Sequence, residues 1–174
     1  MPAPSPLGNP GPDHFGCQGE DRHASPHRPN LASNAPNRHT NGMALTISQP
    51  AHAIMLTAAR RAAPLEACGL LLGTASRIEI AVPTANIAPD ATRDFEIDPA
   101  ALIAAHRAAR DGSGPQVVGY FHSHPNSLTR PSATDAASAA RDGRVWVIVA
   151  NDAITCWRDG ADGFEPLSYC VEQG

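Results

Sequence analysis

Lysine is absent from this chain of 174 residues, and all thirteen basic residues are arginine. Together with 17 acidic residues they give a formal net charge of −4 and an isoelectric point near 6.0. Such a chain has no general attraction for nucleic acid or anionic lipid. The sequence also lacks a stripe of basic and aromatic residues and a helix-turn-helix segment. We therefore expect no nucleic-acid partner, and we attribute the missing lysine to a GC-rich coding bias.

Long apolar runs and closely spaced cysteines are missing too. The longest apolar runs, residues 67–72 and 145–150, fall far short of the roughly 20 residues that cross a bilayer. The N-terminus lacks the basic start and apolar centre of a secretory signal. The four cysteines include no C-x-x-C pair, which argues against a disulfide framework or a thiolate metal site. We expect a cytoplasmic protein without a membrane partner.

Residues 1–42 differ in composition from everything that follows. They contain eight of the 17 prolines and four of the eight histidines, interspersed with asparagine, serine and glycine. A segment of this kind buries too little apolar surface to offset its ordering entropy, so we predict a disordered tail. Residues 43–174 are long enough for one domain with a sizeable core. We hypothesise that Met43 is the true translation start.

Strands and helices are expected to mix without strict alternation in residues 43–174. Helices are predicted at about 49–62, 99–110 and 133–142, and strands at 44–48, 67–73, 78–82, 94–98, 117–121, 145–150, 153–157 and 164–171. The turn Asn151-Asp152 and the glycine-rich residues 160–163 indicate antiparallel hairpins. The pattern predicts an α+β fold, with helices packed against a mixed or antiparallel sheet.

Three side chains are placed to bind a metal ion. His122 and His124 follow an apolar strand, and the period of two puts both imidazoles on one face while Ser123 points away. Ser132 has the character of a helix N-cap, which places the Asp135 carboxylate in the first helical turn. Two imidazoles and one carboxylate suit a single zinc ion and leave a fourth position for water, as in catalytic sites.

Glu66 is the candidate general base. It leads directly into the apolar strand 67–73, where a buried charge needs either a partner or a task. Zinc lowers the pKa of a bound water to about 7. Taking a proton from that water and passing it to a leaving amine is such a task.

Each of these features also has an ordinary structural interpretation. Ser132 and Asp135 form the pattern of a capping box. A His-x-His pair is often partly buried and hydrogen-bonded at the end of a strand. Glu66 is also able to cap a helix or pair with Arg60 or Arg61. Only their combination favours a metal site.

The combination resembles the JAMM (MPN-plus) zinc metalloprotease family, through E-A-C-G-L-L-L-G, H-S-H-P and S-A-T-D. The family pattern is a Glu upstream of His-x-His-Pro, followed by x6-Ser-x-x-Asp, and the resemblance spans about residues 44 to 172. It implies a single MPN/JAMM-like domain with cytidine-deaminase-like layering. It further implies that His122, His124 and Asp135 hold zinc, that Glu66 is the general acid/base, and that Ser132 steadies the tetrahedral oxyanion.

The resemblance also implies a class of substrate. In this family the cleaved bond commonly follows the terminal glycines of ubiquitin or a ubiquitin-like protein, and some small bacterial members act on sulfur-carrier proteins. We therefore expect a zinc metallopeptidase that cleaves a peptide or isopeptide bond after such glycines. By the same resemblance Asn86 holds the substrate backbone, although a hydrogen bond that orders its own loop is the alternative. The oligomeric state stays open.

Three other functions remain compatible with the sequence. A non-catalytic scaffold has the same fold, but such proteins usually lack some of the ligands. A cysteine hydrolase would use Cys68 with a histidine nearby in space. A relative associated with DNA repair shares the histidine and aspartate signature, but the acidic balance counts against it.

Overall fold

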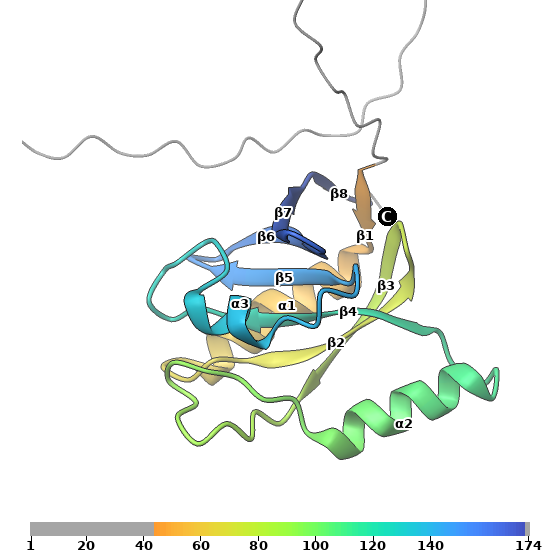
Figure 1. Cartoon of the computed structure of the whole chain (residues 1–174), viewed down its shortest axis with the longest axis horizontal. Helices are drawn as coiled ribbons and strands as arrows, with labels where there is room; N and C mark the ends of the chain where they lie inside the picture. Colours follow the sequence, from red (N-terminus) through yellow and green to blue (C-terminus); the bar gives the residue numbers. More distant parts are fainter. Residues whose placement is uncertain (1–43, 173–174) are drawn as a thin grey trace, which may run out of the picture. The chain divides into compact units, whose positions relative to one another are not determined.

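The computed structural model describes residues 44–172, so the predicted disordered tail, residues 1–42, lies outside the described part. Figure 1 shows helices and strands mixed along the chain, as expected for an α+β fold. In chain order the elements are β1 (Leu45–Ile47), α1 (Gln49–Ala62), β2 (Cys68–Thr74), β3 (Arg77–Thr84), α2 (Pro99–Arg110), β4 (Gln116–Ser123), α3 (Ala133–Ser138), β5 (Val145–Ala150), β6 (Ala153–Gly160), β7 (Gly163–Leu167) and β8 (Tyr169–Val171).

All eight strands form one sheet in the order β7-β6-β5-β4-β2-β3-β1-β8. The pairs β4–β5, β1–β3 and β1–β8 are parallel, whereas the other neighbours are antiparallel. The predicted mixed sheet is therefore confirmed. Only Ser168 separates β7 from β8, yet these strands lie at opposite ends of the sheet order. One residue spans less than about 4 Å, so the sheet must curl until its two edges approach each other.

Helix α1 covers one face of the sheet and forms the main core with it. It begins at Ser48, whose side chain accepts a hydrogen bond from the backbone of Ala51, and Pro50 occupies its first turn. Met55 is fully buried on its inner side. The helix contacts β3, β4 and β5. The core side chains of the central strands on this face include Leu71, Phe121, Val145, Val147 and Val149.

The alternation of the strands leaves another set of side chains on the opposite face. Tyr120, His122 and Trp146 lie there, because they alternate with Phe121 and Val147 of the core. Helix α2 contacts β4 but buries only Ala109, and most of its surface is exposed. Among residues 44–172, no helix is long and apolar enough to cross a membrane.

Two glycines allow the central strands to approach each other closely. A Cβ atom at Gly69 would lie 2.3 Å from the Val82 carbonyl oxygen, and one at Gly119 would lie 1.9 Å from the Val145 carbonyl oxygen. Both distances are shorter than any van der Waals contact, and both meet rigid backbone. Gly69 lies in β2 and Gly119 lies in β4, and these two strands position the residues of the candidate site.

The third helix is shorter than predicted. The alanine-rich pattern predicted a helix over residues 133–142, whereas α3 ends at Ser138. Arg141 adopts a left-handed conformation with φ 56°, and its backbone N–H donates to the Asp159 carboxylate at 2.7 Å. The Gly143 N–H also donates to the Asp159 carbonyl. These long-range contacts replace the helical hydrogen bonds and turn the chain toward β5.

Two of the predicted strands were also wrong. The single strand predicted at residues 164–171 is two strands, because β7 pairs with β6 while β8 crosses to pair with β1. The strand predicted at residues 94–98 is reduced to one bridge between Ile97 and Asn86. The Asn86 side chain bonds the Asp94 carbonyl and the Glu96 N–H, so these backbone groups are not available to a longer ladder.

Candidate metal centre

The end of β4 brings the two histidines together as the sequence predicted. His122 is completely buried and His124 is 4% exposed, and their Nε2 atoms lie 3.0 Å apart. Ser123 points to the other side, where its hydroxyl oxygen accepts a hydrogen bond from the Ala67 N–H at 2.8 Å. Since Ala67 follows Glu66 in the chain, this hydrogen bond also fixes the position of Glu66, the candidate general base, relative to the end of β4.

Asp135 reaches both imidazoles from the first turn of α3. Its Oδ1 lies 3.3 Å from His122 Nε2, and its Oδ2 lies 3.3 Å from His124 Nε2. The same carboxylate accepts a hydrogen bond from the Ser132 N–H, while the Ser132 hydroxyl accepts one from the Asp135 N–H. The capping box and the approach to the histidines therefore coexist, because the cap aims the carboxylate.

The two Nε2 atoms and the two oxygens of the Asp135 carboxylate are spaced as ligand atoms of a tetrahedral metal ion are. Ligand atoms around an ion with bonds of about 2.0–2.1 Å lie roughly 3.3 Å apart, which matches the separations of 3.0 and 3.3 Å. His124 Nδ1 lies 2.7 Å from the Leu128 carbonyl oxygen and donates to it. That hydrogen bond leaves the Nε2 lone pair of His124 free for a metal, the arrangement usual for histidine ligands. The donor set fits zinc.

Glu66 lies beside the histidines and is 4% exposed. One ligand atom from each of Glu66, His122 and His124 falls within 4.8 Å of the others. The Glu66 N–H donates to the Ala91 carbonyl at 2.7 Å, and its carbonyl accepts from Asn86 Nδ2 at 2.9 Å. The backbone of Glu66 is thus held on both sides, which leaves its side chain directed at the histidines.

Burial raises the pKa of Glu66 from 4.5 to about 7. The neighbouring His124 lowers this pKa, and the charges of Asp135 and Asp94 raise it. A carboxylate with a pKa near 7 gains and loses a proton readily at neutral pH, as a general acid/base must. The alternative pairing with Arg60 is not observed, because Arg60 pairs with Asp152 at 2.7 Å.

The candidate metal ligands differ from Glu66 in the charge state that their surroundings favour. Burial raises the pKa of Asp135, but the contacts of its carboxylate with His122 and His124 outweigh burial and hold that pKa well below its usual value. Burial likewise lowers the pKa of His122, although Asp135 raises it. Asp135 therefore stays ionised and His122 stays neutral, which are the forms that bind a cation. Burial also lowers the pKa of His124, but Asp135 and the Leu128 carbonyl outweigh burial and raise it, so a cation would displace a proton from this imidazole.

Side chains that the sequence did not single out surround His122. The ring of Phe95 stacks on its imidazole at a centroid distance of 4.3 Å and an interplanar angle of 15°. Trp146 meets both rings edge-on, at 5.8 Å from His122 and 5.7 Å from Phe95. Phe95 lies in the segment predicted as a strand, residues 94–98, and no motif connected that segment with the histidines.

Asn86 uses its whole side chain within its own loop. Its Nδ2 donates to the carbonyls of Glu66 and Asp94, and its Oδ1 accepts from the N–H groups of Ala88 and Glu96. These four bonds exhaust the two donors and two lone pairs of the amide. The structure therefore supports the alternative prediction for Asn86, in which its side chain orders its own loop.

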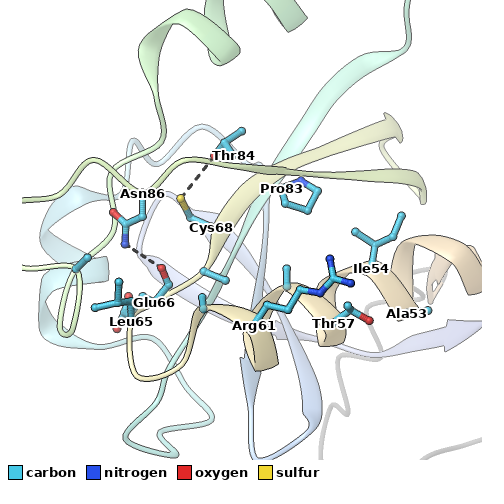
Figure 2. Close-up of a pocket in the computed structure, with 14 residues that line it drawn as sticks. Ala53, Ile54, Thr57, Arg61, Leu65, Glu66, Cys68, Pro83, Thr84 and Asn86 are labelled. Atoms are coloured by element: carbon cyan, nitrogen blue, oxygen red, sulfur yellow. Dashed lines mark hydrogen bonds between the residues drawn. The ribbon is translucent and has the colours of Figure 1, made fainter.

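A cleft of about 610 Å³ leads to Glu66 between α1 and the end of β3. Figure 2 shows Ile54, Thr57 and Arg61 of α1 on one side of it, with Glu66 at one end. Ile54 is 38% exposed and Leu65 is 45% exposed, so the cleft offers apolar surface to a bound chain.

Cys68 forms part of the cleft floor but is only 1% exposed. Its thiol contacts the Thr84 hydroxyl and the Ala85 carbonyl, both at 3.6 Å. Burial raises the pKa of the Cys68 thiol, whereas a nucleophilic cysteine needs a lowered pKa. This environment does not favour the cysteine-hydrolase alternative.

The fold and the cluster of Glu66, His122 and His124 define a JAB-type domain. The chain belongs to the prokaryotic homologs of the JAB domain, which it matches over residues 48–160. Its sequence is 34% identical, over 135 residues, to the Desampylase of Haloferax volcanii, and this similarity covers 74% of the chain and 96% of the relative.

Solved structures show the same fold. Protein DSY2949 from Desulfitobacterium hafniense is similar with a TM-score of 0.66 and 27% identity, over 75% of this chain and 94% of that protein. AF2198, a JAB1/MPN domain protein from Archaeoglobus fulgidus, is similar with a TM-score of 0.51 and 22% identity, over 76% of this chain and all of that protein. The predicted family and the predicted fold class are thereby confirmed.

Proposed function

We propose that the protein is a zinc-dependent metallopeptidase that hydrolyses a peptide or isopeptide bond. The observation that carries the proposal is the convergence of Glu66 on His122 and His124, with Asp135 at 3.3 Å from both imidazoles. The 34% identity to a Desampylase supports hydrolysis as the type of reaction. A cytoplasmic location, predicted from the sequence, belongs to the same proposal.

In this proposal His122, His124 and Asp135 hold one zinc ion. Zinc supplies Lewis acidity, which polarises a carbonyl and acidifies water. Metal binding requires both imidazoles in the neutral form, and the two imidazole contacts keep Asp135 ionised, so the metal-binding set would have one negative charge. A single anionic ligand leaves most of the charge of a divalent cation available to the reaction.

Glu66 moves the protons. Its carboxylate accepts a proton from the attacking water and returns it to the leaving nitrogen. With its pKa raised to about 7, the Glu66 carboxyl both accepts and gives up a proton readily at neutral pH. The backbone of Glu66 is fixed, because its N–H donates to the Ala91 carbonyl and its own carbonyl accepts from Asn86. This fixed backbone keeps the carboxylate in place.

Ser132 is the proposed donor to the oxyanion of the tetrahedral intermediate. Its hydroxyl oxygen is engaged as an acceptor in the helix cap, and this leaves the hydroxyl hydrogen to donate elsewhere. The cap fixes the position of the oxygen. A donor that is fixed before the reaction stabilises developing charge without a cost of reorganisation.

The proposed substrate is a ubiquitin-like or sulfur-carrier protein, cleaved after its C-terminal glycines. The relative named Desampylase supports a small ubiquitin-like modifier as the substrate class. The cleft beside Glu66 supports an extended chain end as the bound form, since it runs between α1 and β3 and is open to solvent.

Replacement of Glu66 by glutamine tests the proposal. We expect Glu66→Gln to bind about one zinc ion per chain and to lose at least about a thousandfold in rate, because a base and a metal act as a unit. Intact-mass analysis of candidate carrier-protein conjugates measures cleavage, and elemental analysis measures zinc.

Glu79→Gln, which alters a carboxylate in β3 away from the site, is the matched control and should keep both activity and zinc. His122→Ala should lose zinc. If the wild type binds zinc but cleaves no conjugate, or if Glu66→Gln cleaves normally, the peptidase proposal is wrong and a scaffold of this fold remains.

A further inference from the structure

The second nitrogen of the His122 imidazole lacks the partner that a metal-binding histidine normally has. Nε2 faces Asp135 and His124, so Nδ1 carries the hydrogen when Nε2 binds a metal. Nδ1 is fully buried and has no hydrogen-bond partner within residues 44–172. Histidine ligands almost always donate this hydrogen to a carbonyl, a carboxylate or water, which fixes the orientation of the ring. His124 follows that rule through Leu128, and His122 does not.

An aromatic ring covers one face of the His122 imidazole. Phe95 lies almost parallel to His122, at 15° and 4.3 Å, which is a stacking geometry. Trp146 closes another side at 84° and 5.8 Å. Phe95 and Trp146 also contact each other, at 5.7 Å, so the three rings form one group in which the imidazole has no exposed surface.

Phe95 is itself fixed by Asn86. The amide of Asn86 bonds the Asp94 carbonyl and the Glu96 N–H, the two residues that flank Phe95. The same amide bonds the Glu66 carbonyl. One side chain therefore sets the position of Phe95 over His122 and the position of Glu66 beside it.

We propose that Phe95 is a positioning residue that orients His122 for metal binding by ring stacking, in place of the missing hydrogen bond. The inference rests on the proposed zinc site. Phe95 has no polar atom. It therefore acts by orienting the imidazole and by excluding water from it. Loss of the ring lets the imidazole rotate and admits water to Nδ1.

Zinc affinity tests the inference without reference to catalysis. The purified wild type, Phe95→Leu, Phe95→Tyr and Phe164→Leu are titrated with zinc in competition with a chromophoric chelator. Phe164 contacts Trp146 at 5.1 Å in the same aromatic group, so its replacement is the matched control for general loss of packing. We expect Phe95→Leu to bind zinc about tenfold more weakly, a typical effect of losing a group that orients a ligand. Phe95→Tyr, which keeps the ring, and Phe164→Leu should stay within about twofold of the wild type.

A second readout is the exchange of the His122 Hδ1 proton with solvent, followed by NMR in the zinc-loaded proteins. It should be slow in the wild type and in Phe95→Tyr, and fast in Phe95→Leu. If Phe95→Leu does not fold, as judged by circular dichroism, Phe95→Met takes its place in both measurements. Unchanged affinity and unchanged exchange without the ring overturn the inference, although the peptidase proposal then stands. A wild type that binds no zinc overturns both.

Discussion

At the scale of the residue, the site separates its ionisable groups into two kinds. Burial and neighbouring carboxylates raise the pKa of Glu66 to about 7, whereas the two histidines keep Asp135 ionised. Both carboxylates are 4% exposed, so burial alone does not distinguish them. The difference comes from the partners, because Asp135 touches two imidazoles at 3.3 Å. One carboxylate is therefore suited to hold a cation and the other to exchange a proton.

The raised pKa of Glu66 predicts how the stability of the metal-free protein depends on pH. The folded protein keeps a proton on Glu66 up to about pH 7, whereas the unfolded chain releases it near 4.5. The tighter binding of this proton in the folded protein adds to the free energy of unfolding. The added stability is fully present below pH 4.5 and is lost as the pH rises to about 7. Relative to Glu66→Gln, the free energy of unfolding of the wild type should therefore fall across this window. Urea denaturation of both proteins, with chelator present, measures the difference, and a difference that is flat or rises would count against the raised pKa.

At the scale of the element, α3 depends on its contacts more than on its own sequence. It has six residues, of which only Asp135 is buried. Helices this short are not stable in isolation. The capping box of Ser132 and Asp135 stabilises its first turn, and Asp159 binds the backbone of the loop that follows it. The proposed zinc ion, shared by Asp135 and the histidines, would connect the beginning of α3 to β4.

Removal of zinc should therefore loosen α3 selectively. We expect the backbone amides of α3 to exchange with deuterium about tenfold faster or more after chelation, because loss of a bound ligand removes its binding free energy from the local opening equilibrium. Helix α1, which is fastened by the core through Ala51 and Met55, is the internal control and should change little. Hydrogen–deuterium exchange with mass spectrometry makes the comparison. Equal protection of α3 with and without zinc would contradict Asp135 as a ligand.

The sequence predicted those elements whose signals are local. Alternation around Ser123 placed both histidines on one face, and the N-cap pattern at Ser132 placed Asp135 correctly. The predicted end of α3 was wrong, because Asp159 binds the backbone of Arg141, 18 residues earlier in the chain, where the helix was expected to continue. Phe95 could not be found, since its partner His122 is close only after β2 and β4 have paired. Long-range contacts, and not local propensity, decided the end of α3 and the position of Phe95.

At the scale of the whole molecule, α1 separates two sides of the domain. Arg61 lines the cleft that leads to Glu66, and no ion pair of Arg61 is found within residues 44–172. Its neighbour Arg60 points to the other side, where it pairs with Asp152. The two arginines have the same charge and adjacent positions, and only one of them faces the proposed path of the substrate.

This arrangement predicts different kinetic effects for the two arginines. Arg61→Ala should raise KM for a carrier-protein conjugate about tenfold and leave kcat unchanged, because a contact away from the cleaved bond stabilises substrate and transition state equally. Arg60→Ala should leave both constants within about twofold of the wild type, since its exposed ion pair contributes little. Steady-state kinetics on both variants makes the test. An equal effect of both changes would mean that the substrate does not follow this cleft.

The two close approaches at Gly69 and Gly119 affect how genetic data on this protein should be interpreted. Any side chain at these positions collides with backbone of β3 or β5, which a sheet core does not accommodate. In a saturation screen scored by survival, both glycines would rank with Glu66 as intolerant positions, although neither takes part in chemistry. Measuring the amount of correctly folded protein beside the phenotype separates the two groups, because Glu66→Gln should accumulate normally and Gly119→Ala should not.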